Sequence, residues 1–120
     1  DLDEIEKELD LISQEVARRA EKRDFKAKTL TLKVKYADFT IVTRSITLNY
    51  FIESGREMLT IAMELLSRVD DIELKKVRLL GLTLKNPDAE EEELHGHPIQ
   101  LEIDFDNPVN PTSILRGSPS

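Results

Sequence analysis

Residues 28–48 read KTLTLKVKYADFTIVTRSITL and contain two β-like runs on either side of Ala37 and Asp38. Across residues 29–36, apolar and polar side chains alternate strictly, which is the period of a strand with one buried and one exposed face. The apolar positions that should face the core are Leu30, Leu32, Val34 and Tyr36. The second run, residues 39–48, is rich in β-branched residues but alternates less regularly. The whole stretch therefore predicts a β-hairpin.

Helical patterns flank this hairpin on both sides. Residues 2–22 place apolar side chains at steps of three and four, which predicts an amphipathic helix. Ser54 and Glu57 have the spacing of a capping box, so a second helix should begin there and end at residues 70–71. Residues 77–84 predict a third strand. The order of these elements indicates an α+β fold, with two helices packed on one face of a small antiparallel sheet and the other face free.

Charge is distributed unevenly along the chain. The formal net charge is −7, but the excess of acid lies beyond Asn86, where eight carboxylates accompany one arginine. Residues 18–44 instead contain nine basic and three acidic residues. A concentrated basic segment attracts polyanions even when the average charge of the chain is negative. A nucleic-acid partner is therefore compatible with this composition.

The hairpin sequence is similar to that of the C-terminal little finger domain in DinB-type Y-family translesion DNA polymerases. Its K-T-L-T-L-K-V-K-Y, D-F and T-R-S segments follow the pattern of that family in the same order. QEVARR at residues 14–19 and VRLLGLTL at residues 77–84 also resemble the family. The resemblance covers residues 1–86 and implies a βαββαβ fold. The strand that normally precedes the first helix is missing from this sequence, so we expect the chain to be a piece of a longer polymerase.

The resemblance implies that the free face of the sheet grips the template-primer duplex. Lysines two apart on a strand point to the same side and can meet successive phosphates, and hydroxyl, guanidinium and backbone N–H groups add further donors. Such contacts hold position without reading base sequence. The candidate DNA-binding residues are Thr31, Lys33, Lys35, Thr43, Arg44, Ser45, Arg78 and Thr83. Four further cations, Arg18, Arg19, Lys22 and Arg23, also suit a structural role at the end of the first helix.

No catalytic residue is assigned within this chain. In the family, the carboxylates that hold Mg²⁺ for nucleotidyl transfer lie in the palm domain, so we expect this fragment to be inactive alone and to bind no cofactor of its own. The main alternative is a freestanding domain of similar fold that binds RNA or another protein. No constellation of residues supports a small standalone enzyme.

The segment from residue 87 to residue 120 is acidic and rich in Pro, Gly and Asn, so we expect a disordered tail. Within it, residues 100–105 read QLEIDF and resemble the sliding-clamp-binding hexapeptide of bacterial polymerases. The candidate clamp-binding residues are Gln100, Leu101, Ile103 and Phe105. The alternative is a strand, because apolar residues alternate from Ile99 onward. Separation from the other elements by an acidic linker favours a docking peptide.

Composition excludes several other classes of protein. The sequence has no cysteine, so neither a disulfide framework nor a thiolate metal site can form. The acidic run at residues 90–93 is expected to be a solvated spacer, and His95 and His97 lack a fixed third ligand, so no metal site is predicted. Without a signal sequence or a long apolar run, a cytoplasmic location with no membrane partner is expected.

Overall fold

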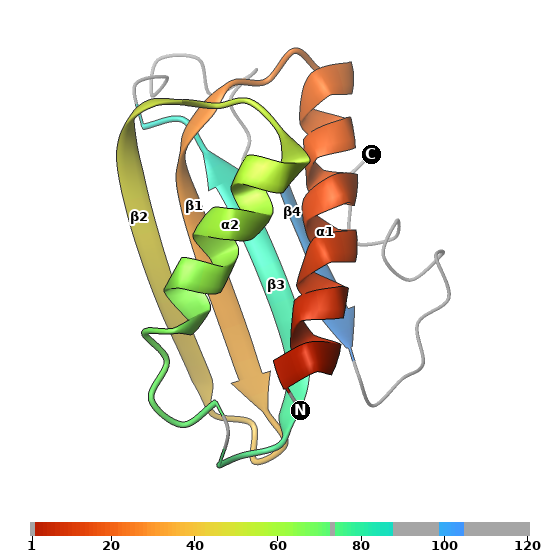
Figure 1. Cartoon of the computed structure of the whole chain (residues 1–120), viewed down its shortest axis with the longest axis vertical. Coiled ribbons are helices and arrows are strands. Elements are labelled where there is room, and N and C mark those ends of the chain that lie inside the picture. Colours follow the sequence, from red (N-terminus) through yellow and green to blue (C-terminus); the bar gives the residue numbers. More distant parts are fainter. Residues whose placement is uncertain (1, 73, 88–98, 105–120) are drawn as a thin grey trace.

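The computed structural model describes residues 2–72, 74–87 and 99–104, and the fold comprises two helices and four strands (Figure 1). The first half of the chain contains α1 (Leu2–Lys22), β1 (Ala27–Tyr36) and β2 (Ile41–Ile52). The second half contains α2 (Gly55–Leu66), β3 (Val77–Lys85) and β4 (Ile99–Asp104). The two helices and first three strands occur where they were predicted, but β2 begins at Ile41 and extends beyond residue 48, α2 ends at Leu66, and β3 extends to Lys85.

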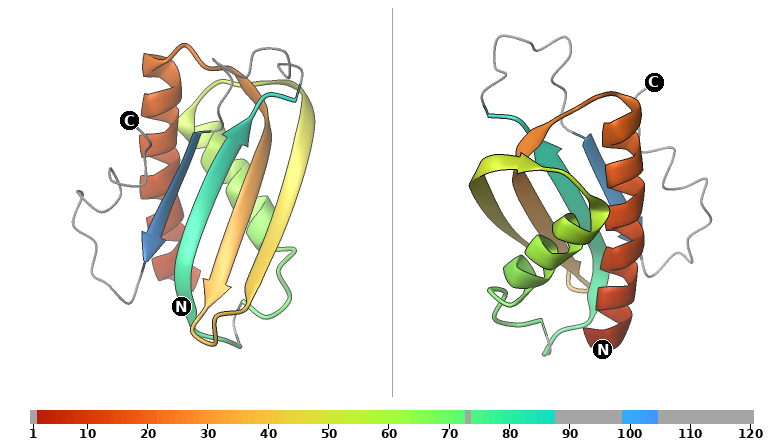
Figure 2. Two further views of the ribbon diagram at one scale, coloured as in Figure 1. Left: turned by 180° about the vertical axis from the view of Figure 1, so that it is seen from behind. Right: turned by 45° about the horizontal axis from the view of Figure 1, so that its top comes forward.

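The strands form one antiparallel sheet in the order β2-β1-β3-β4. Both helices lie on the same face: α1 packs against β3 and β4, and α2 packs against β1 and β2. Figure 2, left, shows the sheet from its other side, with the helices behind it. No element among the described residues covers that second face, which is called the free face below. The predicted α+β architecture is therefore confirmed.

The alternation of β1 determines what each face carries. Leu30, Leu32, Val34 and Tyr36 are all at most 1% exposed beneath the helices, whereas the residues between them are partly exposed. In an antiparallel pair, residues directly opposite each other point to the same face. The register thus assigns the residues of β2, β3 and β4 to the core or to the free face according to their partners in the adjacent strand.

Local sequence explains how α2 begins. The Ser54 hydroxyl accepts a hydrogen bond from the Glu57 backbone N–H at 3.1 Å, and the Glu57 carboxylate accepts one from the Glu53 N–H at 3.0 Å. The first bond satisfies an amide that the first turn of a helix leaves unpaired, as the capping-box spacing predicted, whereas the second joins the Glu57 carboxylate to the residue before the N-cap. The start of α2 lies close to α1: a Cβ at Gly55 would be 3.4 Å from the Ala17 Cβ, an ordinary van der Waals contact.

The strand β4 departs from the sequence expectation. Residues 99–104 were expected within a disordered tail, but they pair with β3 from Leu79↔Asp104 to Leu84↔Ile99. The physical reason is the alternation of apolar and polar residues from Ile99 onward, which had indicated a strand as the alternative to a docking peptide. It places Ile99, Leu101 and Ile103 on the helix side, where each is at most 4% exposed. Residues 88–98 and 105–120 of the predicted tail, which include His95, His97 and Phe105, lie outside the described residues.

Candidate nucleic-acid interface

Side chains that can bind phosphate project from β1 onto the free face. Thr31, Lys33 and Lys35 alternate with the buried apolar residues of β1 and are partly exposed. Lys33 is opposite Thr43 of β2 and Gly81 of β3, so it lies near the middle of the sheet. The predicted row of cations and hydroxyls on β1 is therefore present on one face.

Hydroxyl groups join neighbouring strands across this face. The Thr31 and Ser45 side-chain oxygens are 2.6 Å apart, and those of Thr29 and Thr47 are 2.8 Å apart. A hydroxyl can donate one hydrogen bond and also accept. In each pair, one hydroxyl donates to the other, and the accepting hydroxyl keeps its own hydrogen for an external acceptor. These pairs thus combine sheet stability with a capacity to bind phosphate oxygens.

A cationic cluster occupies one end of the face, around Phe39. The Lys35 Nζ lies 5.2 Å from the centre of the Phe39 ring, and the Arg78 guanidinium carbon lies 4.6 Å from it. Phe39 is 59% exposed and has a φ of 71° in the turn between β1 and β2. Cations over an aromatic ring are held in place without losing their charge. The structure thus brings together Lys35 and Arg78, two of the candidate DNA-binding residues, through an aromatic ring that was not among the candidates.

The turn that carries Phe39 is fixed by hydrogen bonds to Asp38. The Thr40 backbone N–H and hydroxyl both donate to the Asp38 carboxylate, at 3.0 and 2.6 Å, and the Lys75 ammonium lies 3.4 Å from it. These hydrogen bonds, followed by the charge of Lys75, lower the pKa of Asp38 below its usual range. The aspartate therefore stays ionised and holds the turn at neutral pH.

Arg44 is not on the free face. It is directly opposite Leu32, a residue that is fully buried beneath the helices, so the two side chains share the helix-facing side. There the Arg44 Nε donates to the Arg68 carbonyl oxygen at 3.3 Å, just beyond the end of α2. The expectation that Arg44 projects outward with Lys33 and Lys35 is thus wrong, because the register places even-numbered residues of β2 on the helix side. Its neighbours Thr43 and Ser45 do face outward.

Lys85 adds a cation to the free face that was not among the residues expected from the sequence. It is exposed at the end of β3 and lies opposite Thr29, so it belongs to the free face with Thr83, which is opposite Thr31. The sequence indicates the position of Lys85 on this face, because the alternation of residues 80–84 continues by one position to Lys85. The predicted third strand had ended one residue too early.

The strand β4 adds a carboxylate to this face. The Glu102 Oε2 lies 2.7 Å from the Lys33 Nζ, and the Gln100 side-chain oxygen is 3.5 Å from the Thr83 hydroxyl. Glu102 is opposite Gly81, where an added Cβ would come within 2.9 Å of the Glu102 Cγ. The ion pair therefore bridges across a position that only a residue without a side chain leaves open. Periodicity alone could not reveal this pairing.

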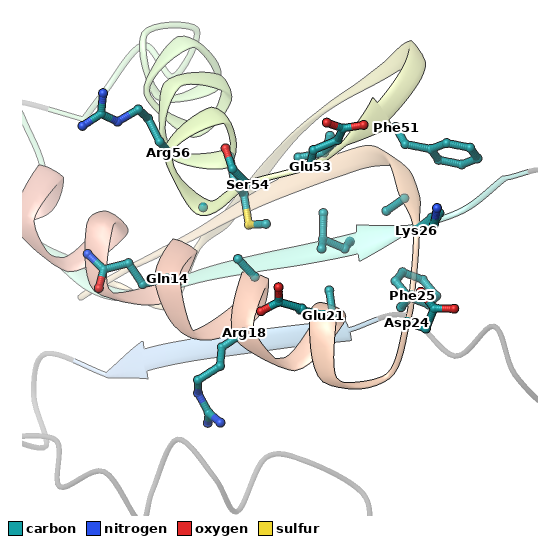
Figure 3. A pocket seen from close by; sticks show the side chains of 17 residues that line it. Gln14, Arg18, Glu21, Asp24, Phe25, Lys26, Phe51, Glu53, Ser54 and Arg56 are labelled. Carbon is teal, nitrogen blue, oxygen red and sulfur yellow. The ribbon is translucent and has the colours of Figure 1, made fainter.

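A separate pocket lies away from the free face, between the C-terminal part of α1 and the start of α2 (Figure 3). Its labelled lining includes Arg18 and Glu21 of α1 together with Ser54 and Arg56 near the start of α2. The lining mixes both charges with apolar surface, and its one hydroxyl, that of Ser54, caps α2. Among the described residues, there is also no group of three or more His, Cys, Asp or Glu side chains that could hold a metal ion.

No helix in the described part of the chain has the length and apolar character needed to cross a bilayer.

Comparison with known proteins places the chain in a family. Residues 1–103 match the family described as impB/mucB/samB family C-terminal domain. This match covers both helices and almost all of the sheet.

Curated relatives share sequence over the same region. DNA polymerase IV of Leptospira interrogans serovar copenhageni is 40% identical over 99 residues, which cover 78% of this chain and 27% of the relative. DNA polymerase IV of Clostridium perfringens (strain SM101 / Type A) is 42% identical over 86 residues, covering 72% of this chain and 24% of the relative. That of Bacteroides fragilis (strain YCH46) is 36% identical over 98 residues, covering 82% and 27%.

The chain thus spans about a quarter of the length of the curated relatives it matches, in their C-terminal part. The two helices on one face of an antiparallel sheet agree with the architecture of the little finger domain. The family match and these relatives together show that the chain belongs to the impB/mucB/samB C-terminal domain family, the little finger domain of DinB-type Y-family DNA polymerases.

Proposed function

We propose that the free face of the sheet binds the sugar-phosphate backbone of double-stranded template-primer DNA. The observation that carries this proposal is the row of Lys33, Lys35 and Thr31 on one uncovered face, bordered by hydroxyl pairs and by the Arg78 cluster. These groups donate hydrogen bonds but present no built pocket for a base edge. The domain therefore holds the duplex without reading its sequence, as a polymerase that moves along any template requires.

A paired substitution tests this face. Replacing Lys33 and Lys35 with Ala should weaken binding to a fluorescently labelled primer-template duplex at least about tenfold at low salt, because two phosphate contacts are lost. Lys7→Ala/Arg56→Ala is the matched control: it removes the same charge from exposed positions on α1 and α2. Equal losses in the two variants would show a general charge effect and reject the assigned face.

The salt dependence gives an independent measurement. If about four to six phosphates are contacted, the log–log plot of affinity against salt should have a slope of about −4 to −5. A slope near zero would contradict phosphate binding. Replacing the DNA by duplex RNA or by protein ligands tests the alternative of a freestanding interaction domain, which would prefer one of those.

We also propose that residues 100–105 bind the bacterial sliding clamp and tether the parent polymerase to it. The support is the QLEIDF sequence and its position after a little finger domain. A captured peptide would place Leu101, Ile103 and Phe105 in apolar clefts of the clamp, with the Gln100 amide at the rim, and the tether would raise the effective concentration of polymerase on DNA. Gln100→Ala/Phe105→Ala should abolish retention on immobilised clamp while leaving DNA affinity unchanged; retention of this variant would reject the motif.

The catalytic step belongs, on this proposal, to other parts of the parent protein. Translesion DNA synthesis requires carboxylates that bind two Mg²⁺ ions, and in this family they are in the palm domain. The isolated chain should therefore show no nucleotide incorporation with Mg²⁺ and a primer-template. Incorporation by the purified chain would require a different functional class.

A further inference from the structure

We propose that β4 is a self-inhibitory strand: while it is docked on β3, it withholds the clamp-binding residues and neutralises a DNA-binding lysine, and capture of β4 by the clamp reverses both effects. This inference rests on the proposed function, since it concerns the regulation of the same two binding surfaces. It adds that the two surfaces are coupled. The coupling is carried by contacts that β4 makes within the domain.

The first contact is apolar burial. Leu101 and Ile103, which the clamp would take up, are 2% and 4% exposed in the core beneath α1. Their backbone is paired with β3, with Leu101 opposite Leu82 and Ile103 opposite Leu80. The same side chains cannot fill clefts on the clamp while they fill this core. Docking on β3 and capture by the clamp are therefore mutually exclusive.

The second contact is electrostatic. Glu102 lies on the opposite side of β4 from Leu101, and its carboxylate is 2.7 Å from the Lys33 ammonium on the free face. A phosphate that binds Lys33 would have to displace this carboxylate and would meet its negative charge. Docked β4 thus lowers the affinity of the central lysine for DNA. Gly81 permits this contact, because a side chain there would collide with Glu102.

The position of β4 makes its release possible without unfolding the hairpin. It is a six-residue strand at the edge of the sheet and pairs only with β3 among the described strands. The β1–β2 and β1–β3 pairings, which carry Lys33 and Lys35, do not depend on it. An edge strand can be exchanged for another partner at the lowest cost in backbone pairing. The free face would therefore persist when β4 leaves.

Thermodynamic linkage then fixes the sign of the coupling. Clamp binding removes Glu102 from Lys33 and should raise the affinity for DNA. DNA binding displaces Glu102 and should raise the affinity for the clamp by the same factor. Only molecules with β4 released can bind the clamp. The apparent clamp affinity of the free chain is therefore the intrinsic affinity multiplied by the fraction of molecules in which β4 is released.

A disulfide across the β3–β4 pair tests the exclusion directly. Leu79 and Asp104 are directly opposite each other at the end of β4 that follows Leu101 and Ile103, and neither belongs to a proposed binding set. The chain has no cysteine of its own. The oxidised Leu79→Cys/Asp104→Cys chain should bind the bacterial sliding clamp at least about tenfold more weakly than the same chain after reduction, because the crosslink lies beyond Leu101 and Ile103 and holds them against the core. The reduced form is its own control for the two substitutions. Equal clamp affinity in the oxidised and reduced forms would overturn the proposal.

A second variant tests the electrostatic contact and needs no crosslink. Glu102→Gln should raise affinity for the primer-template duplex about threefold to tenfold at low salt, since it removes a negative charge from the phosphate-binding row. Glu6→Gln removes the same charge from an exposed position on α1 and should change the affinity less than twofold. Equal effects of the two substitutions would overturn this part of the proposal.

The clamp itself supplies the last comparison. Added sliding clamp should raise the DNA affinity of the unmodified chain, but not that of the oxidised disulfide variant. No increase for the unmodified chain would refute the coupling. Failure of the proposed function would give different results. If Lys33→Ala/Lys35→Ala leaves DNA binding unchanged, the free face is misassigned. If the clamp binds neither the unmodified chain nor the reduced variant, the hexapeptide is not a clamp ligand.

Discussion

Leu101 of β4 lies directly opposite Leu82 of β3, and the two side chains are 2% and 0% exposed. The segment that was expected in a disordered tail thus supplies part of the hydrophobic core. The Leu101→Ala substitution should lower the free energy of unfolding by about 2–5 kcal/mol, because it removes buried methyl groups and leaves a cavity. Urea denaturation monitored by circular dichroism measures this change.

The exposed neighbour Gln100 provides the control for this prediction. Gln100→Ala should change the free energy of unfolding by less than about 0.5 kcal/mol. If Leu101→Ala were equally mild, β4 would not be packed against β3 in solution, and residues 99–104 would behave as the free peptide that the sequence had suggested.

Arg44 should contribute to stability more than to DNA binding. Its side chain is on the helix-facing side and donates to the Arg68 carbonyl beyond the end of α2. Arg44→Ala should therefore lower the free energy of unfolding by about 1 kcal/mol, the usual value of such a hydrogen bond. Lys35→Ala, on the free face, should weaken DNA binding several-fold more than Arg44→Ala in fluorescence anisotropy. A larger loss of DNA affinity in Arg44→Ala than in Lys35→Ala would show that Arg44 contacts DNA.

The cap of α2 can be tested at Ser54. Because the Ser54 hydroxyl accepts from the Glu57 N–H, Ser54→Ala should cost about 1 kcal/mol in the free energy of unfolding. Ser54→Asp keeps a side-chain acceptor at the same position and should restore most of the loss. If both variants lose the same stability in urea denaturation, the hydrogen bond is not the cause.

Tyr36 gives the domain a dependence on alkaline pH. Burial, followed by the negative charge of Asp71, raises the pKa of the Tyr36 hydroxyl. In the unfolded chain the pKa is about 10, so the folded state keeps its proton at a pH where the unfolded state loses it. The contribution of Tyr36 to stability is therefore full below about pH 10 and is lost as the pH rises above it.

Thermal unfolding of the Tyr36→Phe variant checks this sign. Lysines also titrate at high pH, so the quantity to compare is the difference in Tm between the unmodified chain and the variant. That difference should move in favour of the variant between about pH 9 and pH 11. Near pH 7 the variant should be at least as stable, because the buried Tyr36 hydroxyl has no hydrogen-bond partner among the described residues. A pH-independent difference would contradict the raised pKa.

Much of this architecture could be predicted without coordinates. The strict alternation of residues 29–36 assigned Thr31, Lys33 and Lys35 to one face, and the structure places them there. Ser54 and Glu57 marked the start of α2, and the apolar steps of residues 2–22 marked α1. These features are local: they depend on the period of side chains along one element and on hydrogen bonds within one helical turn.

Only the tertiary structure decided the orientation of Arg44, the partner of Lys33 and the position of β4. Apolar residues of β2 occur on both of its faces, so the sequence of β2 alone does not show which of them is buried. The pairing of Arg44 with Leu32 of β1 places Arg44 on the helix-facing side. The Lys33–Glu102 ion pair joins residues 69 positions apart across Gly81. Alternation in residues 99–104 was visible, but alternation is common to a packed strand and to an extended docking peptide. The choice between them depends on whether a sheet edge and an apolar helix face lie within reach, which is a property of the folded chain.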